Sequence, residues 1–175
     1  MSHENISIER AHHVAYRCKD AEETRAFYED LLGLPLAHVV RDAAGEIEFL
    51  HLFFALDDGT FLAFFDVAEE TPDETYKWKD GLRDYHYAME VKDMDTLTAM
   101  MERLKAADVM VFGPIDHGFV HSIYFWDPNG VALEFTCRDE NYTKILTDEG
   151  PKASDSVAKW MAEKVVKPKA EAPAG

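Results

Sequence analysis

The sequence predicts an α+β fold made of two copies of one unit, each a strand, a helix and a hairpin. Two amphipathic helices are expected, at about residues 21 to 32 and 94 to 106. The first begins at an N-cap residue, Asp20, and ends at Gly33. The second begins at Asp93 and places its apolar side chains at helical spacing.

Strand-like runs surround both helices. One run precedes each helix, and two more follow it, joined by a turn that ends in glycine. The predicted strands are His13–Arg17, Phe49–Ala55, Phe61–Phe65, His86–Val91, Ser122–Trp126 and Val131–Thr136, and the turns are Asp57–Gly59 and Asp127–Gly130.

These two units form an internal repeat. Corresponding residues are separated by 73 positions from His13 to His86, 73 from Asp20 to Asp93, and 71 from Gly59 to Gly130. Two copies of one supersecondary unit at this period are expected to bury a common apolar face. We therefore predict one domain over residues 1–140, with modules at about 8–68 and 82–138.

Two segments fall outside these modules. Residues 67–84 contain Pro72 and many charges, which predicts a connector. The composition changes after residue 140, so residues 141–175 are predicted to form a C-terminal helix, near 154–166, and a disordered tail. The apolar stripe of this helix predicts that it caps the domain, and docking on a partner subunit is the alternative.

The composition excludes several classes of protein. The chain has 175 residues, of which 47% are hydrophobic, so it can bury a sizeable core. Its formal net charge of −16 repels phosphate backbones and anionic membranes, so no nucleic acid or membrane partner is expected. Two isolated cysteines and the lack of a long apolar segment predict a soluble, cytoplasmic protein.

Three residues form a candidate metal site. His13 and His86 occupy equivalent places in the two modules, and Glu134 lies in an apolar run where a buried carboxylate needs a partner. Two imidazoles and one carboxylate are the facial ligand set of non-haem iron and related divalent ions. The first-module equivalent of Glu134 is Ala63, so a fourth protein ligand is absent and coordination positions stay open for substrate.

Each of these residues has another interpretation when taken alone. A histidine on a strand is usually a core or surface residue, and a glutamate in an apolar run often makes an edge strand soluble. The coincidence of His13, His86 and Glu134 at repeat-related positions favours the metal site.

Two motifs give the chain a family resemblance. Residues 13–33, with the motif FYxDLLG, and residues 121–134, with YFxDPNGxxLE, resemble the vicinal oxygen chelate superfamily. That family contains glyoxalase I, fosfomycin and bleomycin resistance proteins, methylmalonyl-CoA epimerase and extradiol dioxygenases. The resemblance covers about residues 8–138. It implies paired βαβββ modules that form an open, eight-stranded half-barrel around a metal.

The resemblance also implies roles for individual residues. It implies His13, His86 and Glu134 as the metal ligands, and Ala63 departs from the four-ligand pattern of glyoxalase I. Tyr124 resembles the active-site tyrosine of extradiol dioxygenases, with a role in core filling as the alternative.

Two histidines are candidates for a neighbouring acid or base. His51 and His117 are preferred to His121, because strand alternation places His121 on the face opposite Tyr124.

The leading functional hypothesis is a metal-dependent dioxygenase of the extradiol, ring-cleaving type. We expect Fe(II), with Mn, Zn or Ni as alternatives, a catecholic or related aromatic substrate, and a homodimer. Two alternatives remain open. One is a redox-neutral lyase, isomerase or transferase that uses a divalent metal, and the other is a small-molecule-binding protein of the resistance type.

Overall fold

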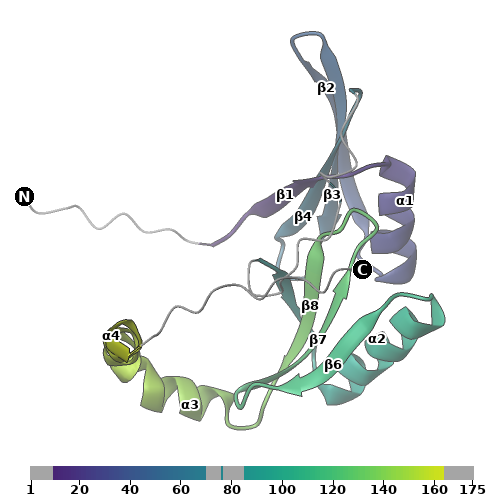
Figure 1. The fold of residues 1–175 in the computed structure, drawn as a ribbon. Helices are drawn as coiled ribbons and strands as arrows, with labels where there is room; N and C mark the ends of the chain where they lie inside the picture. The colour runs from purple at the N-terminus through teal and green to yellow at the C-terminus, as the bar shows by residue number, and fades with distance from the viewer. Residues whose placement is uncertain (1–9, 70–75, 77–84, 164–175) are drawn as a thin grey trace, which may run out of the picture.

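The structure is a computed structural model that describes residues 10–69, 76 and 85–163. It contains two separate four-stranded sheets, each with its own helix, and a C-terminal pair of helices (Figure 1). Most of the predicted connector and the predicted disordered end of the tail lie outside the described residues.

The first sheet has the strand order β1-β4-β3-β2. Strand β1 runs parallel to β4, and the other two pairs are antiparallel. Its elements are β1 (His13–Arg17), α1 (Ala21–Arg25) with a π-helical continuation (Ala26–Leu31), β2 (Leu36–Ala44), β3 (Ile47–Ala55) and β4 (Phe61–Val67).

The second sheet repeats this arrangement in the order β5-β8-β7-β6. Strand β5 runs parallel to β8, as β1 does to β4. Its elements are β5 (Tyr87–Glu90), α2 (Met94–Ala106), β6 (Val111–Asp116), β7 (Val120–Trp126) and β8 (Ala132–Arg138). The predicted open arrangement of two βαβββ modules is therefore confirmed.

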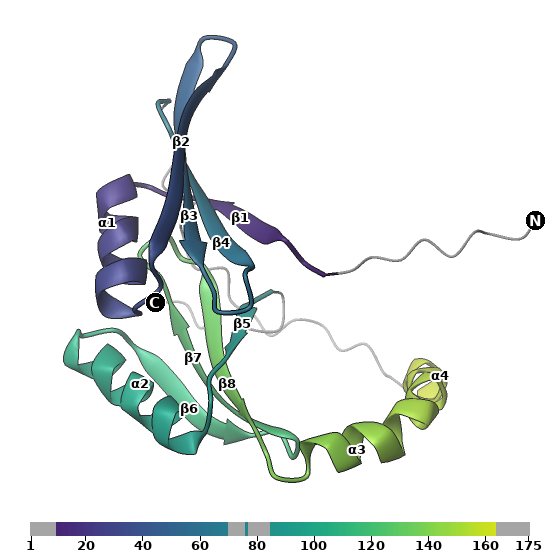
Figure 2. The ribbon, with the colours of Figure 1, turned by 180° about the vertical axis from the view of Figure 1, so that it is seen from behind.

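One face of each sheet forms the core. In the first module the ring of Tyr28 packs against Phe54 and Phe64, with centroids 5.1 and 4.8 Å apart. In the second module Leu97 and Leu104 of α2 are buried in the same hydrophobic cluster. Helices α1 and α2 lie side by side in both views (Figures 1 and 2), and the cluster runs without a break through both modules.

The turn between β7 and β8 joins the second module to the first. Tyr28 Oη donates to Asp127 Oδ2 at 3.0 Å, and Asn129 Nδ2 donates to Thr24 Oγ1 at 3.1 Å. The backbone N–H of Lys19 donates to Asn129 Oδ1 at 2.8 Å. Burial raises the pKa of Asp127, so this carboxylate depends on its hydrogen bonds for stability.

Replacing Tyr28 with phenylalanine is expected to lower the free energy of unfolding by about 1 to 3 kcal/mol, because a buried acceptor loses its donor. Tyr16→Phe is the matched control, since no hydrogen bond of its hydroxyl is found among the described residues. Chemical denaturation of both variants measures the difference. Equal losses of stability would show that the bond between Tyr28 and Asp127 contributes nothing.

The C-terminal segment forms α3 (Tyr142–Glu149), a 3₁₀ turn (Gly150–Lys152) and α4 (Ala153–Glu163). The prediction that the terminal helix caps the domain is wrong, because neither α3 nor α4 has a buried residue. Tyr142 stacks on Phe119 and lies under Arg138, and from this anchor the helices lead away from the sheets (Figure 2). None of the described helices is long and apolar enough to cross a membrane.

Candidate metal centre

Each sheet has a face that is turned away from its helix, and strand alternation sets its residues. We call these the first and second open faces. The first open face carries three polar residues and four phenylalanines: His13, Arg17, His51, Phe49, Phe53, Phe61 and Phe65. The second open face carries His86, Ser122, Tyr124 and Glu134.

Two of the predicted ligands meet on the second open face. His86 Nε2 lies 2.8 Å from Glu134 Oε2. Glu134 is only 6% exposed, so its carboxylate needs a nearby donor or cation. His86 provides a donor from just before β5, and Glu134 projects from the neighbouring strand β8.

Tyr124 lies directly beside this pair. It is the cross-strand partner of Glu134, and its ring centroid is 5.8 Å from that of His86. Its hydroxyl hydrogen-bonds to His117 Nε2 at 2.8 Å. Burial raises the pKa of Tyr124, and the negative charge of Glu134 raises it further. The structure thus brings together four predicted site residues: His86, Glu134, Tyr124 and His117.

His13 lies apart from these four residues, on the first open face. Its Nδ1 is 2.9 Å from His12 Nδ1, and its ring neighbours are His51 at 6.1 Å and Phe53 at 5.8 Å. Within residues 10–69, 76 and 85–163, no three His, Cys, Asp or Glu side chains are grouped to hold a metal ion. His86 and Glu134 are therefore placed to bind a metal ion together. Within a single chain, the third predicted ligand, His13, does not lie near them.

His51 is also on the first open face, beside His13 and not beside Tyr124. Its ring stacks on Phe65 at 3.7 Å and contacts Phe53 at 4.1 Å. Burial lowers its pKa, and the neighbouring His13 lowers it further. Ala63, the position of the absent fourth ligand, is fully buried.

Arg17 is a residue of the first open face that the sequence interpretation did not select. It follows His13 by four residues on β1, so alternation places both on one face. Its Nη2 donates to Glu69 at 2.8 Å, while its Nε is buried without a partner. The sequence did contain a signal for Arg17. It is a cation in a chain of net charge −16, and it lies an even number of residues after the predicted ligand His13.

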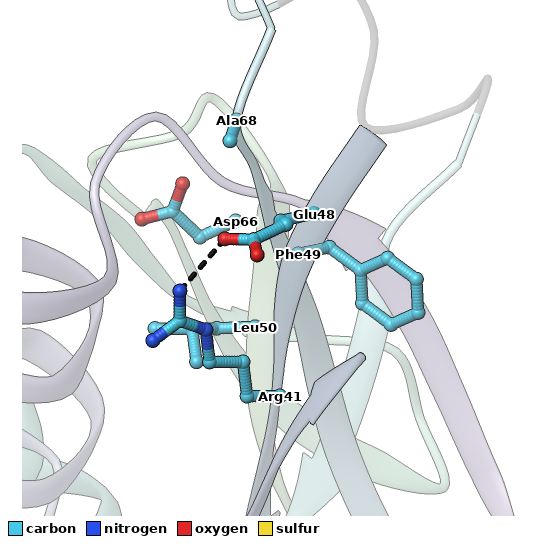
Figure 3. Close-up of a pocket in the computed structure, with 6 residues that line it drawn as sticks. All are labelled: Arg41, Glu48, Phe49, Leu50, Asp66 and Ala68. Atoms are coloured by element: carbon cyan, nitrogen blue, oxygen red, sulfur yellow. Dashed lines mark hydrogen bonds and ion pairs between the residues drawn. The ribbon is translucent and has the colours of Figure 1, made fainter. Parts of the chain in front are cut away.

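A cavity of about 270 Å³ lies elsewhere, between the β2–β3 hairpin and the end of β4 (Figure 3). Its polar groups already have partners: Arg41 pairs with Glu48 at 2.7 Å, and Asp66 accepts from the N–H of Ala21 at 2.8 Å. None of the predicted site residues lines it. This cavity is therefore separate from the candidate metal centre.

A family model, that of the Glyoxalase/Bleomycin resistance protein/Dioxygenase superfamily, matches residues 10–135. The chain belongs to this superfamily. The matched region covers most of both modules and contains every predicted site residue, and it confirms the resemblance inferred from the two motifs. A search of curated proteins finds no match.

Solved structures share the fold. A glyoxalase/dioxygenase from Nostoc punctiforme is 24% identical, with 79% of this chain and 100% of that chain covered and a TM-score of 0.59. The fosfomycin resistance protein FosX from Listeria monocytogenes is 20% identical, with 78% and 98% covered and a TM-score of 0.57. TnmS3, an antibiotic-binding protein from a Streptomyces species, is 18% identical, with 77% and 100% covered and a TM-score of 0.55.

Proposed function

We propose that this chain is a divalent-metal enzyme, a ring-cleaving dioxygenase of the extradiol type that acts on a catecholic substrate. The observation that supports it is the arrangement on the second open face. Two predicted ligands, the buried Glu134 and the more exposed His86, lie 2.8 Å apart and next to a tyrosine that is hydrogen-bonded to a histidine. Metal ligands beside a proton-transfer pair suit a substrate that must lose protons as its oxygens bind a metal.

The third ligand in this proposal is His13 of the partner subunit. Within one chain, His13 lies on a different sheet from His86 and Glu134, and it is exposed. A homodimer with twofold symmetry that sets the first open face of one chain against the second open face of the other completes two equal sites. Fosfomycin resistance protein FosX, which shares this fold, has been solved with Mn(II) bound.

The residues of the chain then have distinct tasks. His86 and Glu134 would hold the ion, which would supply Lewis-acid and redox chemistry when bound. Tyr124 Oη lies beside Glu134 and is positioned to exchange a proton with a substrate hydroxyl. His117 Nε2, 2.8 Å away, accepts the phenolic proton and returns it. The aromatic side chains of the first open face exclude water from the substrate ring.

Metal analysis tests this proposal. Protein purified without chelators is expected to contain about one equivalent of iron per chain and to consume oxygen with catechols. His86→Ala is expected to lose the metal while keeping its circular dichroism spectrum. Iron-loaded protein that consumes no oxygen with any catechol or hydroquinone would overturn the dioxygenase assignment.

Other results of the same measurement would select the alternatives. Stoichiometric zinc, nickel or manganese, with turnover in the absence of oxygen, would assign a redox-neutral lyase, isomerase or transferase. A protein that stays metal-free after reconstitution and returns an aromatic ligand unchanged would be a binding protein.

A further inference from the structure

Two buried side-chain nitrogens in the described part of the chain have no hydrogen-bond partner: Arg17 Nε and His51 Nε2. Both belong to the first open face. Both are also in register with Phe65, Arg17 from β1 on one side and His51 from β3 on the other. The three residues form one row across the sheet, and we call it the Arg17–His51 row.

Buried polar atoms without a partner are costly, and no other side chain in residues 10–69, 76 and 85–163 has one. The buried side chains of Asp127, Asn129 and Thr24 are all hydrogen-bonded. Because Arg17 Nε and His51 Nε2 lie in one row, a single ligand that hydrogen-bonds to both explains their lack of partners better than two unrelated causes. Their chemistry defines what that ligand must offer, which is oxygen acceptors for one cationic and one imidazole donor.

The row also provides a surface for an aromatic ring. His51 stacks on Phe65 with centroids 3.7 Å apart, and Phe49 lies 5.4 Å from Phe65. Neighbouring strands are about 4.8 Å apart, so the backbones of Arg17 and His51 are separated by roughly 10 Å, which spans one substituted ring. Arg17 Nη2 donates to Glu69 at 2.8 Å, and this contact leaves Nε buried without a partner.

We propose that the Arg17–His51 row binds an aromatic carboxylate. The carboxylate accepts a charge-assisted hydrogen bond from Arg17 Nε, the ring packs against the aromatic side chains beside Phe65, and another oxygen of the ligand accepts from His51 Nε2. This inference rests on the proposed function in taking the first open face as part of the substrate site. It adds that the substrate class is acidic.

The charge of the chain makes such a contact selective. With a formal net charge of −16, the protein repels anions in general, so an anionic ligand must be held by a local cation. Arg17 is a cation of the first open face, at the end of the edge strand β1 and in register with Phe65.

Binding to protein treated with a chelator tests the proposal independently of any metal. The probes are 6-hydroxy-2-naphthoate, whose hydroxyl provides the second oxygen, and its neutral analogue 6-hydroxy-2-naphthamide, called naphthoate and naphthamide below, titrated by isothermal calorimetry into the full chain. Naphthoate is expected to bind at least tenfold more tightly than the amide, because the charge-assisted hydrogen bond is lost in the amide. Equal affinities would overturn the proposal, and this outcome is separate from a failed oxygen assay.

Three variants locate the contact. Arg17→Met is expected to weaken naphthoate binding at least tenfold and to leave naphthamide binding unchanged. His51→Phe keeps the stacking surface, removes Nε2 and is expected to weaken both probes several-fold. Glu69→Gln is the control, because it keeps the donors of Arg17 and removes a competing carboxylate, so naphthoate should bind equally or more tightly.

Unchanged naphthoate binding in a folded Arg17→Met protein would overturn the proposal. If that variant does not fold, unchanged binding in His51→Phe would do so.

Discussion

Chains with His13→Ala and chains with His86→Ala are each expected to be inactive, whereas a mixture of the two is expected to regain activity. The physical reason is the separation of the predicted ligands within one chain. His86 contacts Glu134 on the second sheet, while His13 contacts His51 and Phe53 on the first. If each metal centre combines one half from each subunit, a mixed dimer contains one site in which all three ligands are present.

The size of the recovery follows from random pairing. Equal amounts of the two variants give one half mixed dimers, and one of the two sites in each mixed dimer is intact. About a quarter of the wild-type activity and metal content is therefore expected after the subunits are unfolded together and refolded.

A matched control mixes His86→Ala with Glu134→Ala. Both substitutions lie in the same half of the site, so their mixed dimer has no intact centre and no recovery is expected. Recovery in the control, or none in the test mixture, would contradict a site shared between subunits. A protein that sediments as a monomer while holding metal would contradict it as well.

Local signals explain why most of the fold could be predicted. The Asp20 and Asp93 side chains accept the backbone N–H groups of Glu23 and Thr96, as their N-cap spacing predicted. Strand β1 and helix α2 have the predicted bounds, because caps and alternation act over a few residues. The nearly constant repeat offset then placed equivalent residues on equivalent strands.

Two strands could not be located from the sequence. Strand β2 is exposed over most of its length and lacks an apolar alternation. Strand β6 contains Gly113 and Pro114, residues that ordinarily signal a turn. Both are held in place by hairpin pairing with the next strand along the chain, β3 or β7, so hydrogen bonds to that strand, and not an apolar pattern of their own, make them strands.

Interactions between modules were the hardest to predict. The repeat placed His13 and His86 at equivalent positions of the two modules. Equivalent positions need not be close in space, so the repeat did not predict the distance between the two side chains in one chain. The register of β7 and β8 did bring Tyr124 to Glu134, because a hairpin fixes that distance locally. The apolar stripe of α4 is a similar case. The sequence pattern indicated an apolar helix face, but it did not indicate what that face packs against. Val157, Trp160 and Met161 are 63%, 65% and 58% exposed.

Replacing Tyr124 with phenylalanine is expected to lower kcat by about 10²- to 10⁴-fold, the usual contribution of a positioned acid or base. The phenylalanine ring keeps the packing of a side chain that is 7% exposed, and His86 and Glu134 are untouched, so metal content should not change. Only the hydroxyl that bonds to His117 is removed. The measurement is kcat, with metal content and thermal stability determined on the same sample.

The double variant Tyr124→Phe with His117→Gln decides whether the two residues act as one unit. If His117 works through the hydroxyl of Tyr124, removing both costs little more than removing either, because groups that act together are not additive. Tyr142→Phe serves as the control, since that ring stacks on Phe119 at the base of α3. A Tyr124→Phe enzyme with full metal and unchanged kcat would assign Tyr124 to core filling. The proton exchange would then have to use a group other than the hydrogen-bonded pair beside Glu134.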